Sequence, residues 1–328
     1  MRKSSFQRIV ALVAACFAPA TASRAAQSMA VQVSAAVPVQ EKFATTPDGV
    51  RLYYRVAGSD GPYVIAPFAL YHGSSLDPLA KGRRIVTYDP RGRGRSMAAP
   101  LDRVSLDYLL TDLDTVRQAV GAERVSIIGW SGAGMETFVY TLRNPERVDR
   151  LVQLAPVAPR FEPYGTTMMQ DRDARTDKAA RAALQARVNS GEFRGKSAEL
   201  CRARAVVSGP PLLFDPSIQL TIPDVCDSAN EHPDTIGAYF GALFASIDGY
   251  DWRDELAQVK IPRLVVHGVR DNIPLAGNEE WVRGQADARL LIVGRTGHFP
   301  QYENPAVTLP AIDRFLSGDW PPGAKALP

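Results

Sequence analysis

Histidine and cysteine are scarce in this chain of 328 residues, which contains four histidines and three cysteines. These residues are scattered without the spacing that metal ligands show, so the sequence predicts no metal site. No glycine-rich phosphate loop follows a first strand, and the sequence contains no low-complexity segment or internal repeat. We therefore expect an ordinary globular protein that needs no cofactor.

The chain also carries little net charge. Its formal net charge is +3, but residues 1–26 hold four basic and no acidic residues, so the rest of the chain carries one net negative charge. Such a protein gains little from nucleic acid or anionic lipid through charge alone. The arginine-rich run 91–95 is therefore interpreted as local structure, and a small molecule or short peptide is the expected partner.

Residues 1–26 have the pattern of a signal peptide. A basic start precedes an apolar run over residues 9–18, which is too short to span a membrane in the mature protein. Small residues follow, and Ala20-Thr21-Ala22 fits a cleavage site. The sequence thus predicts export to the periplasm or the outside of the cell. Residues 13–16 are an alternative lipobox, in which Cys16 would carry a lipid anchor.

Removal of the leader would leave two cysteines, Cys201 and Cys226. In an oxidising compartment, two cysteines with no other partner are expected to form a disulfide. The alternative is two buried thiols. Export would favour the bridge.

Strands and helices alternate along most of the chain. Short apolar or alternating runs predict strands, the first of them in a hairpin with the preceding segment, at residues 52–56, 63–66, 84–88, 125–128, 151–154, 263–266 and 289–293. Helical spacing of apolar residues and helix stop signals predict helices near residues 106–120, 132–142, 278–285 and 306–316. This alternation is typical of an α/β fold with a mostly parallel central sheet and helices on both faces.

The alternation stops over residues 160–247, which are rich in Arg, Ala, Asp and Pro and contain no comparable apolar strand. We predict that this segment is a helical lid inserted into one sheet domain. The other expected divisions are a signal peptide at 1–26, a linker at 27–44, the core at 45–159 and 248–318, and a C-terminal tail at 319–328.

One stretch of the sequence carries chemistry. Residues 127–134 (Ile-Ile-Gly-Trp-Ser-Gly-Ala-Gly) combine the end of an apolar strand with a serine among small residues, directly before a predicted helix. This pattern is typical of a nucleophile elbow, in which Ser131 sits on a sharp, strained turn. The amide of Gly132, at the helix N-terminus, would face a developing oxyanion. The alternative is a turn of small residues that only packs.

Together with other stretches, the elbow resembles the α/β-hydrolase superfamily. The supporting segments follow predicted strands and are residues 88–96, 129–134, 267–271 and 297–300. The order of serine, aspartate and histidine along the chain is that of this fold. One departure is Ala133, because the family usually has glycine two residues after the serine. The resemblance covers residues 45–160 and 248–318 and implies an α/β-hydrolase fold.

His298 and Asp271 are the predicted partners of the serine. His298 follows the last predicted strand at the sheet edge where Ser131 is expected, so it could accept the serine proton and return it to a leaving group. Asp271 follows the strand that ends at Val266, and a buried carboxylate there would orient the imidazole. The alternatives are a surface-loop histidine and an aspartate that closes a turn.

The second oxyanion donor has two candidate positions. His72-Gly73 resembles the His-Gly that follows the third strand in this family, which would nominate the amide of Ser74. His72 lies only 17 residues before Asp89, however, which is short for a loop, a helix and a strand. The preferred alignment ends the strand at Ala66, so that Phe68 or Ala69 gives the amide.

Substrate-binding residues follow from the family resemblance. A serine nucleophile disfavours members that use aspartate and leaves acyl transfer to water. The lid and the Arg-Gly-x-Gly-x-Ser stretch look most similar to the proline iminopeptidase-like group, in which a lid carboxylate binds the substrate's amino end. Glu231 is the candidate here, with a solvated lid carboxylate as the alternative, and Trp130 is expected to contact substrate.

Three functions remain open at this point. The first is an exported serine hydrolase that cleaves esters or amides through an acyl-enzyme on Ser131. The second is an aminopeptidase similar to proline iminopeptidase. The third is a ligand-binding protein that kept the fold without turnover.

Overall fold

A central sheet of eight strands organises the chain in the computed structural model, which describes residues 37–217 and 224–328. The strand order is β1-β2-β4-β3-β5-β6-β7-β8; β1, β2 and β4 pair antiparallel, and the rest pair parallel. The strands are β1 (Val39–Thr45), β2 (Arg51–Ala57), β3 (Tyr63–Pro67), β4 (Arg84–Tyr88), β5 (Val125–Trp130), β6 (Val148–Leu154), β7 (Arg263–Gly268) and β8 (Ala288–Val293). The predicted α/β fold with a mostly parallel sheet is confirmed.

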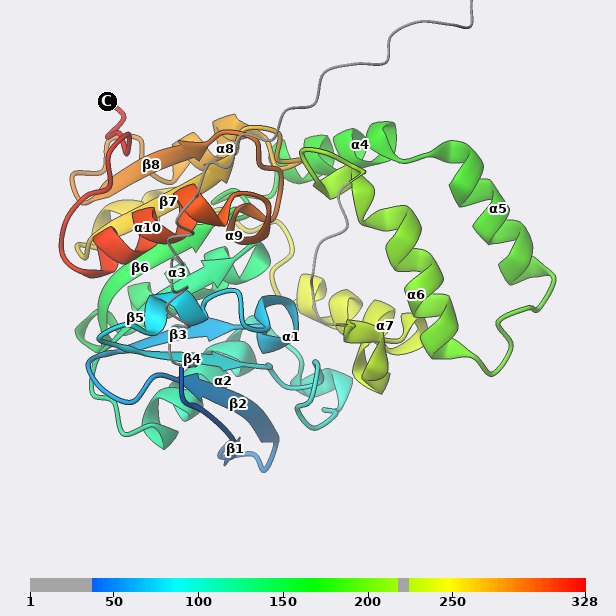
Figure 1. The fold of residues 1–328 in the computed structure, drawn as a ribbon, viewed down its shortest axis with the longest axis horizontal. Helices are drawn as coiled ribbons and strands as arrows, with labels where there is room; N and C mark the ends of the chain where they lie inside the picture. Colours follow the sequence, from blue (N-terminus) through cyan, green and yellow to red (C-terminus); the bar gives the residue numbers. More distant parts are fainter. Residues whose placement is uncertain (1–36, 218–223) are drawn as a thin grey trace, which may run out of the picture. The chain divides into compact units, whose positions relative to one another are not determined.

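Helices cover both faces of this sheet (Figure 1). Helices α2 and α3 pack on one face, and α10 packs on the other. The helices are α1 (Ala69–His72), α2 (Leu106–Ala119), α3 (Gly132–Arg143), α4 (Tyr164–Arg175), α5 (Lys178–Asn189), α6 (Ser197–Ser208), α7 (Pro233–Ala245), α8 (Leu275–Glu280), α9 (Pro300–Glu303) and α10 (Pro305–Leu316). Helix α2 begins at Ser105, whose hydroxyl accepts from the Tyr108 amide.

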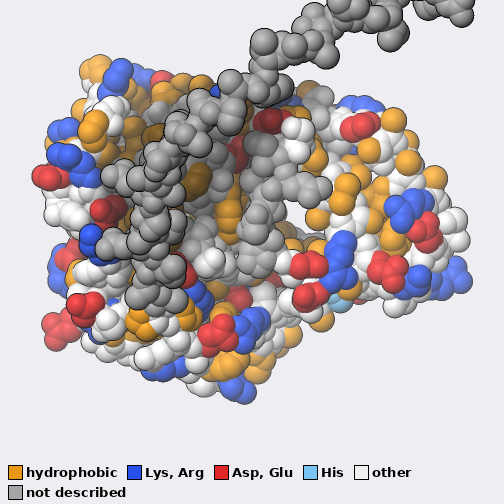
Figure 2. Space-filling model, in the orientation of Figure 1, with side chains coloured by type: hydrophobic (Ala, Val, Ile, Leu, Met, Phe, Trp, Pro, Cys, Tyr) orange, Lys and Arg blue, Asp and Glu red, His pale blue; other side chains and the backbone are white. Residues whose placement is uncertain are grey.

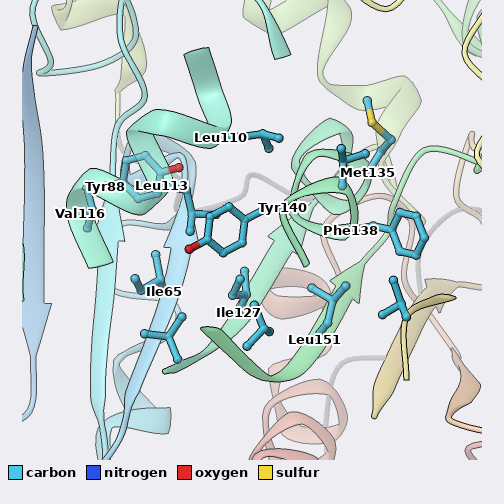
Figure 3. Packing of buried hydrophobic residues seen from close by; sticks show 14 of the residues in the cluster. Ile65, Tyr88, Leu110, Leu113, Val116, Ile127, Met135, Phe138, Tyr140 and Leu151 are labelled. Carbon is cyan, nitrogen blue, oxygen red and sulfur yellow. The ribbon is translucent and has the colours of Figure 1, made fainter. Parts of the chain in front are cut away.

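Between the sheet and the helices α2 and α3 lies a core of apolar side chains (Figure 3). These side chains recur at helical spacing in the helices and at alternate positions in the strands. Leu110, Leu113 and Val116 of α2 lie against the sheet residues Ile65 and Ile127. Apolar burial of this kind contributes roughly 1.5–3 kcal/mol for each large side chain. It makes the sheet a rigid support for the loops at the ends of its strands.

The four helices between β6 and β7 differ from the rest. The chain leaves the sheet after β6, forms α4–α7 and returns at β7, and no strand occurs in the described parts of residues 160–247. Among the described residues of α5 none is buried, and α6 buries only Cys201. A disulfide joins Cys201 to Cys226, as the first of the two alternatives predicted. We call residues 160–247 the α4–α7 segment.

Some boundaries differ from the sequence prediction. The predicted linker 27–44 is wrong at its end, because residues 39–45 form β1 and complete the expected hairpin with β2. The helix expected over 278–285 is α8, which begins at Leu275 and ends at Glu280, and the two residues that follow it, Trp281 and Val282, are fully buried. The signal peptide 1–26 and Cys16 lie outside the described residues.

The C-terminal tail, residues 319–328, lies along β8. Lys325 and Leu290 exchange two backbone hydrogen bonds of 2.8 Å. Leu327 accepts a further one from the Gly284 amide at 3.0 Å. The tail therefore covers the outer edge of the last strand.

Candidate active site

Ser131 lies on a strained turn between β5 and α3. Its backbone has φ 56° and ψ −124°, a left-handed conformation that is uncommon for a residue with a side chain. A side chain at Gly129 would collide with the Thr137 hydroxyl, and one at Gly134 would come within 2.6 Å of Pro156. Ala133 fits and is buried. Gly129 and Gly134 are therefore required by the close approach of α3 to β5 and to the chain that follows β6.

The side chain of Ser131 contacts a histidine and, through it, an aspartate. His298 Nε2 lies 2.9 Å from Ser131 Oγ, and His298 Nδ1 lies 3.0 Å from Asp271 Oδ1. The Asp271 side chain is fully buried, and its Oδ1 also accepts from the Ile273 amide at 3.0 Å. The structure thus brings together the three residues that the sequence nominated from separate segments.

Strand order explains this meeting. Asp271 follows the end of β7, and His298 follows the end of β8, the next strand in the sheet. Ser131 follows β5, which is parallel to both. The carboxyl ends of parallel strands share one edge of a sheet, so three loops far apart in sequence converge there.

Trp130 holds the histidine loop in place. The sequence predicts that this residue contacts substrate, but its side chain points to the opposite side of β5 from α3 and the residue is 8% exposed. Its indole Nε1 donates to the backbone carbonyl of His298 at 2.8 Å. The ring packs against His298 and Phe299, with centroid distances of 5.1 and 4.9 Å. Trp130 is therefore a support for His298.

Glu303 is a second support, and the sequence analysis did not find it. Its Oε1 accepts from the amides of Gly297 and Phe299 at 2.8 and 3.1 Å, one on each side of His298. Its Oε2 accepts from the amide of Phe214 in the α4–α7 segment at 2.7 Å. Burial raises the pKa of Glu303 above its ordinary value. The sequence could have indicated this role of Glu303, because an acidic residue in the first turn of a helix often accepts hydrogen bonds from backbone amides at the start of that helix.

The residues around β3 favour one of the two oxyanion alignments. His72 lies in α1 and is fully buried, and burial lowers its pKa to about 4. Phe68 follows the end of β3 and has φ 69°, so the chain turns sharply there. Phe68 and Ala69 therefore stand where the preferred alignment puts the second amide donor. Gly132 is the first residue of α3, so its amide has no acceptor within the helix.

Comparison with known proteins gives the family. The family model described as alpha/beta hydrolase fold matches residues 68–305. The chain belongs to the α/β hydrolase fold family.

Similar proteins span most of this α/β hydrolase. A non-heme chloroperoxidase from Streptomyces lividans is 28% identical over 246 residues, which cover 70% of this chain and 82% of the relative. A proline iminopeptidase from Heyndrickxia coagulans is 24% identical over 251 residues, 74% of this chain and 84% of that one. A serine hydrolase structure from Cycloclasticus zankles has a TM-score of 0.65 at 21% identity and covers 86% and 99% of the two chains. The family and these relatives indicate a hydrolase.

Glu231 has a different environment from either sequence expectation. It is 5% exposed, so it is not a solvated carboxylate. Its two oxygens accept from Arg93 Nε and Nη2 at 2.8 and 2.9 Å, and Oε1 also accepts from the Gly94 amide at 3.0 Å. A carboxylate bound in this way has little capacity left for a substrate amine. In this α/β hydrolase Glu231 fastens the α4–α7 segment to the loop after β4.

That loop is the arginine-rich run of the sequence. Arg91 and Arg93 are both fully buried, and Arg91 pairs with Asp112 at 2.7 Å. Asp89 accepts from the amides of Leu70 and Arg95, and burial raises its pKa to about 6. The run is therefore local structure, as the charge balance indicated.

No group of three or more histidine, cysteine or acidic side chains among the described residues could hold a metal ion. No described helix has the length and apolar character needed to cross a membrane.

Proposed function

We propose that this protein is an exported serine hydrolase that cleaves carboxylic esters or amides through an acyl-enzyme on Ser131. The observation that carries the proposal is the unbroken series of contacts from Ser131 Oγ through His298 to the buried Asp271. A strained serine on an elbow, with a histidine at hydrogen-bond distance, is the arrangement that activates a hydroxyl for attack.

The first half of the reaction forms the acyl-enzyme. His298 Nε2 accepts the Ser131 proton while Oγ bonds to the substrate carbonyl carbon, and the carbonyl oxygen becomes an oxyanion. The Gly132 amide and that of Phe68 or Ala69 would donate to this oxygen. His298 then gives its proton to the leaving alcohol or amine as the carbon–heteroatom bond breaks.

The second half repeats these steps with water. His298 accepts a proton from water, the hydroxide oxygen bonds to the acyl carbon, and the proton returns to Ser131 as the acid leaves. Asp271 has a positioning role in both halves. Its carboxylate accepts from Nδ1–H, which leaves Nε2 free to act as the base and stabilises the imidazolium.

An aminopeptidase activity is the alternative within the same chemistry. The similarity to proline iminopeptidase supports it. The engagement of Glu231 by Arg93 weighs against it, because the carboxylate expected to bind the amine is already paired. We therefore rank ester and amide hydrolysis first.

Covalent labelling tests the proposal. A fluorophosphonate should label the wild-type protein and the control Ser190→Ala, which changes an exposed serine at the end of α5. It should fail to label Ser131→Ala. Labelling of Ser131→Ala at the wild-type rate would refute the assignment, and an unlabelled wild type would favour the ligand-binding alternative.

Substrate comparison separates the two enzymatic functions. Hydrolysis of a short-chain nitrophenyl ester and of a prolyl-naphthylamide is measured on the same preparation. A higher kcat/KM for the ester is expected, and the reverse would identify the aminopeptidase.

The proposal includes the covering role of the α4–α7 segment and export. The bonds from Leu212 to His298 and from Glu231 to Arg93 support a lid over Ser131. Fractionation of cells that express the full chain tests export: a processed protein in the periplasm or medium is expected. Retention of the precursor in the cytoplasm would contradict export, and loss of membrane association in Cys16→Ser would identify a lipid anchor.

A further inference from the structure

A closed ring of hydrogen bonds joins the loop that carries His298 to the α4–α7 segment. The His298 amide donates to the carbonyl of Leu212 at 2.8 Å, and two residues later the Phe214 amide donates to Glu303 Oε2 at 2.7 Å. Glu303 Oε1 in turn accepts from the amides on either side of His298 at 2.8 and 3.1 Å. We call residues 297–299 the histidine loop and residues 212–214 the strap. Every backbone amide of the histidine loop is thus bonded either to the strap or to the carboxylate that holds the strap.

The strap lies directly on the histidine loop. A Cβ atom at Gly297 would come within 2.3 Å of the Leu212 carbonyl oxygen and 2.9 Å of the Phe214 amide nitrogen, so only glycine leaves room for the strap. Leu213, the middle residue of the strap, is 6% exposed and belongs to the same apolar cluster as Trp130. The strap is therefore seated by apolar packing as well as by hydrogen bonds.

Glu303 is the side chain that joins the two backbones. Its carboxylate oxygens divide between them, with Oε1 on the histidine loop and Oε2 on the strap. The groups that donate to it among the described residues are three backbone amides, and charge-assisted bonds of this kind are shorter and stronger than those between neutral groups. Burial raises the pKa of Glu303, and the three amides oppose that rise. A single side chain thus fastens the strap to the histidine loop.

The placement of the imidazole depends on this loop. His298 Nε2 lies 2.9 Å from Ser131 Oγ, a distance at which a proton can pass between them. A displacement of about 1 Å at a reacting group can cost about 100-fold in rate. A shift of the histidine loop would therefore impair both proton transfers, the one from Ser131 and the one to the leaving group.

We propose that Glu303 is a positioning residue that makes His298 competent as the base only while the strap is seated on the histidine loop. This inference rests on the proposed function of Ser131 and His298. When the strap is displaced, the His298 amide loses its acceptor and Glu303 loses the Phe214 amide, so the loop is held from one side only. Catalysis is thereby coupled to the docking of the α4–α7 segment.

Matched esters separate this positioning from a merely structural role. Nitrophenyl, trifluoroethyl and methyl butyrate carry the same acyl group, and the three are compared by kcat/KM at pH 8. Nitrophenolate leaves without a proton, whereas an alkoxide needs one from His298. The ratio of kcat/KM for the alkyl esters to that for the nitrophenyl ester therefore reports the placement of His298. This ratio does not depend on how much of the preparation is folded.

Glu303→Ala removes both attachments. Its kcat/KM should fall about tenfold on the nitrophenyl ester and about 100-fold on the alkyl esters, so the alkyl-to-nitrophenyl ratio falls about tenfold. Glu303→Gln keeps the shape and one acceptor oxygen and should restore part of this ratio. The control Glu123→Ala, at an exposed position, should keep the wild-type ratio.

A pair of variants at Phe214 tests the strap itself. Phe214→Pro removes the amide hydrogen that reaches Glu303, and Phe214→Ala is the matched reference because it keeps this hydrogen and loses the same ring. Leu213 is extended, with φ −98° and ψ 152°, and so accepts a proline after it. The alkyl-to-nitrophenyl ratio should be at least threefold lower in Phe214→Pro than in Phe214→Ala. Adding Phe214→Pro to Glu303→Ala should lower the ratio no further, because the two changes break the same bond.

The outcomes distinguish this inference from the proposed function. An equal loss on all three esters in Glu303→Ala would show a merely structural role and overturn the inference, and so would equal ratios in Phe214→Pro and Phe214→Ala. A wild type that hydrolyses the nitrophenyl ester but neither alkyl ester would also overturn it, since His298 would then supply no proton. If no ester is hydrolysed and no fluorophosphonate label is incorporated, the proposed function itself has failed.

Discussion

The sheet core and the α4–α7 segment hold their positions by different means. The core buries continuous apolar surface on both faces of the sheet, and β5 and β7, which precede Ser131 and Asp271, are almost entirely buried. The α4–α7 segment buries little, and Figure 2 shows acidic and basic side chains interspersed over it. Helix α7 packs Tyr239 and Leu243 against Val104 and Leu109 of the core, and hydrogen bonds and ion pairs supply other attachments.

Some of the polar contacts between this segment and the core lie at or beside the candidate site. Glu231 binds Arg93, the carbonyl of Leu212 accepts from the His298 amide at 2.8 Å, and the amide of Phe214 donates to Glu303. The comparison teaches that continuous apolar packing fixes the candidate site residues, whereas smaller apolar contacts and discrete polar contacts attach the segment that adjoins them. Substitutions in the two regions should therefore affect different quantities.

The largest effect is expected at the proposed nucleophile and base. Ser131→Ala or His298→Ala should lower kcat on the best ester by on the order of 10⁴-fold or more, with an unchanged melting temperature. Steady-state kinetics and thermal denaturation on the same samples check this. Activity above a few per cent of wild type in either variant would contradict the proposed roles.

Asp271→Asn should cost about 10³–10⁴-fold in kcat, because an amide favours the wrong tautomer of His298. The matched control is Asp251→Asn, which changes an exposed aspartate bound to Arg253 and should remain within twofold of wild type. Near-normal turnover in Asp271→Asn would point to another acid.

The buried ion pair tests how the α4–α7 segment is attached. Arg93→Met leaves the Glu231 carboxylate buried without its partner, so the free energy of unfolding should fall by about 3–5 kcal/mol. The double variant Arg93→Met/Glu231→Leu should recover much of this loss. Urea denaturation measures both.

The control for that pair is another arginine and glutamate in the same segment. Arg187 and Glu192 form a similar ion pair, but their side chains are 50% and 43% exposed, against 0% and 3% for Arg93 and Glu231. Arg187→Met should change stability by less than about 1 kcal/mol. Equal effects of Arg93→Met and Arg187→Met would show that burial of the pair is unimportant.

His72 makes the stability of the core depend on pH. Its pKa falls from 6.5 to about 4 on folding because of burial, so only the unfolded chain takes up this proton between these values. The contribution of His72 to the free energy of unfolding is therefore complete above pH 6.5 and is lost as the pH falls toward 4. At about 1.4 kcal/mol per unit, the loss amounts to roughly 3 kcal/mol.

The variant His72→Leu lacks this titration. Its free energy of unfolding should decline less than that of the wild type between pH 6.5 and 4, as measured by urea denaturation at several pH values. Parallel curves for the two proteins would mean that His72 is protonated in the folded state.

Trp130→Phe should have the smallest effect. It keeps an aromatic ring but removes the hydrogen bond to the His298 carbonyl, so kcat/KM should fall about tenfold, equivalent to roughly 1.4 kcal/mol. Trp252→Phe is the control, because the Trp252 indole N–H has no acceptor among the described residues. An equal loss in both variants would show that ring size, and not the bond, matters.

The fold and the meeting of Ser131, Asp271 and His298 could be predicted because they follow from local patterns. Strands such as β4 and β7 appear as short apolar runs, and the glycines at 129 and 134 leave room for the close approach of α3 and of Pro156. The edge at which parallel strands end then determines which loops meet. None of this depends on knowing a distant side chain.

The roles of Trp130, Glu231 and Glu303 could not be predicted in the same way. Each depends on a partner far along the chain: His298 for Trp130, Arg93 for Glu231 and Phe214 for Glu303. An isolated glutamate has the same appearance in sequence whether it is solvated, binds substrate or pairs with a buried arginine. Only the packing of α4–α7 distinguishes these cases.

The two outer strands of the sheet differ in what protects them from pairing with another chain. Strand β1 has the charged residues Glu41 and Lys42 near its middle, which discourage the addition of a foreign strand. At β8 the protection is the protein's own terminus, since Lys325 occupies the backbone groups of Leu290. Shortening the chain before residue 325 would therefore open a hydrogen-bonding edge beside apolar side chains. Such a truncation is expected to lower solubility before it affects the chemistry at the opposite strand ends.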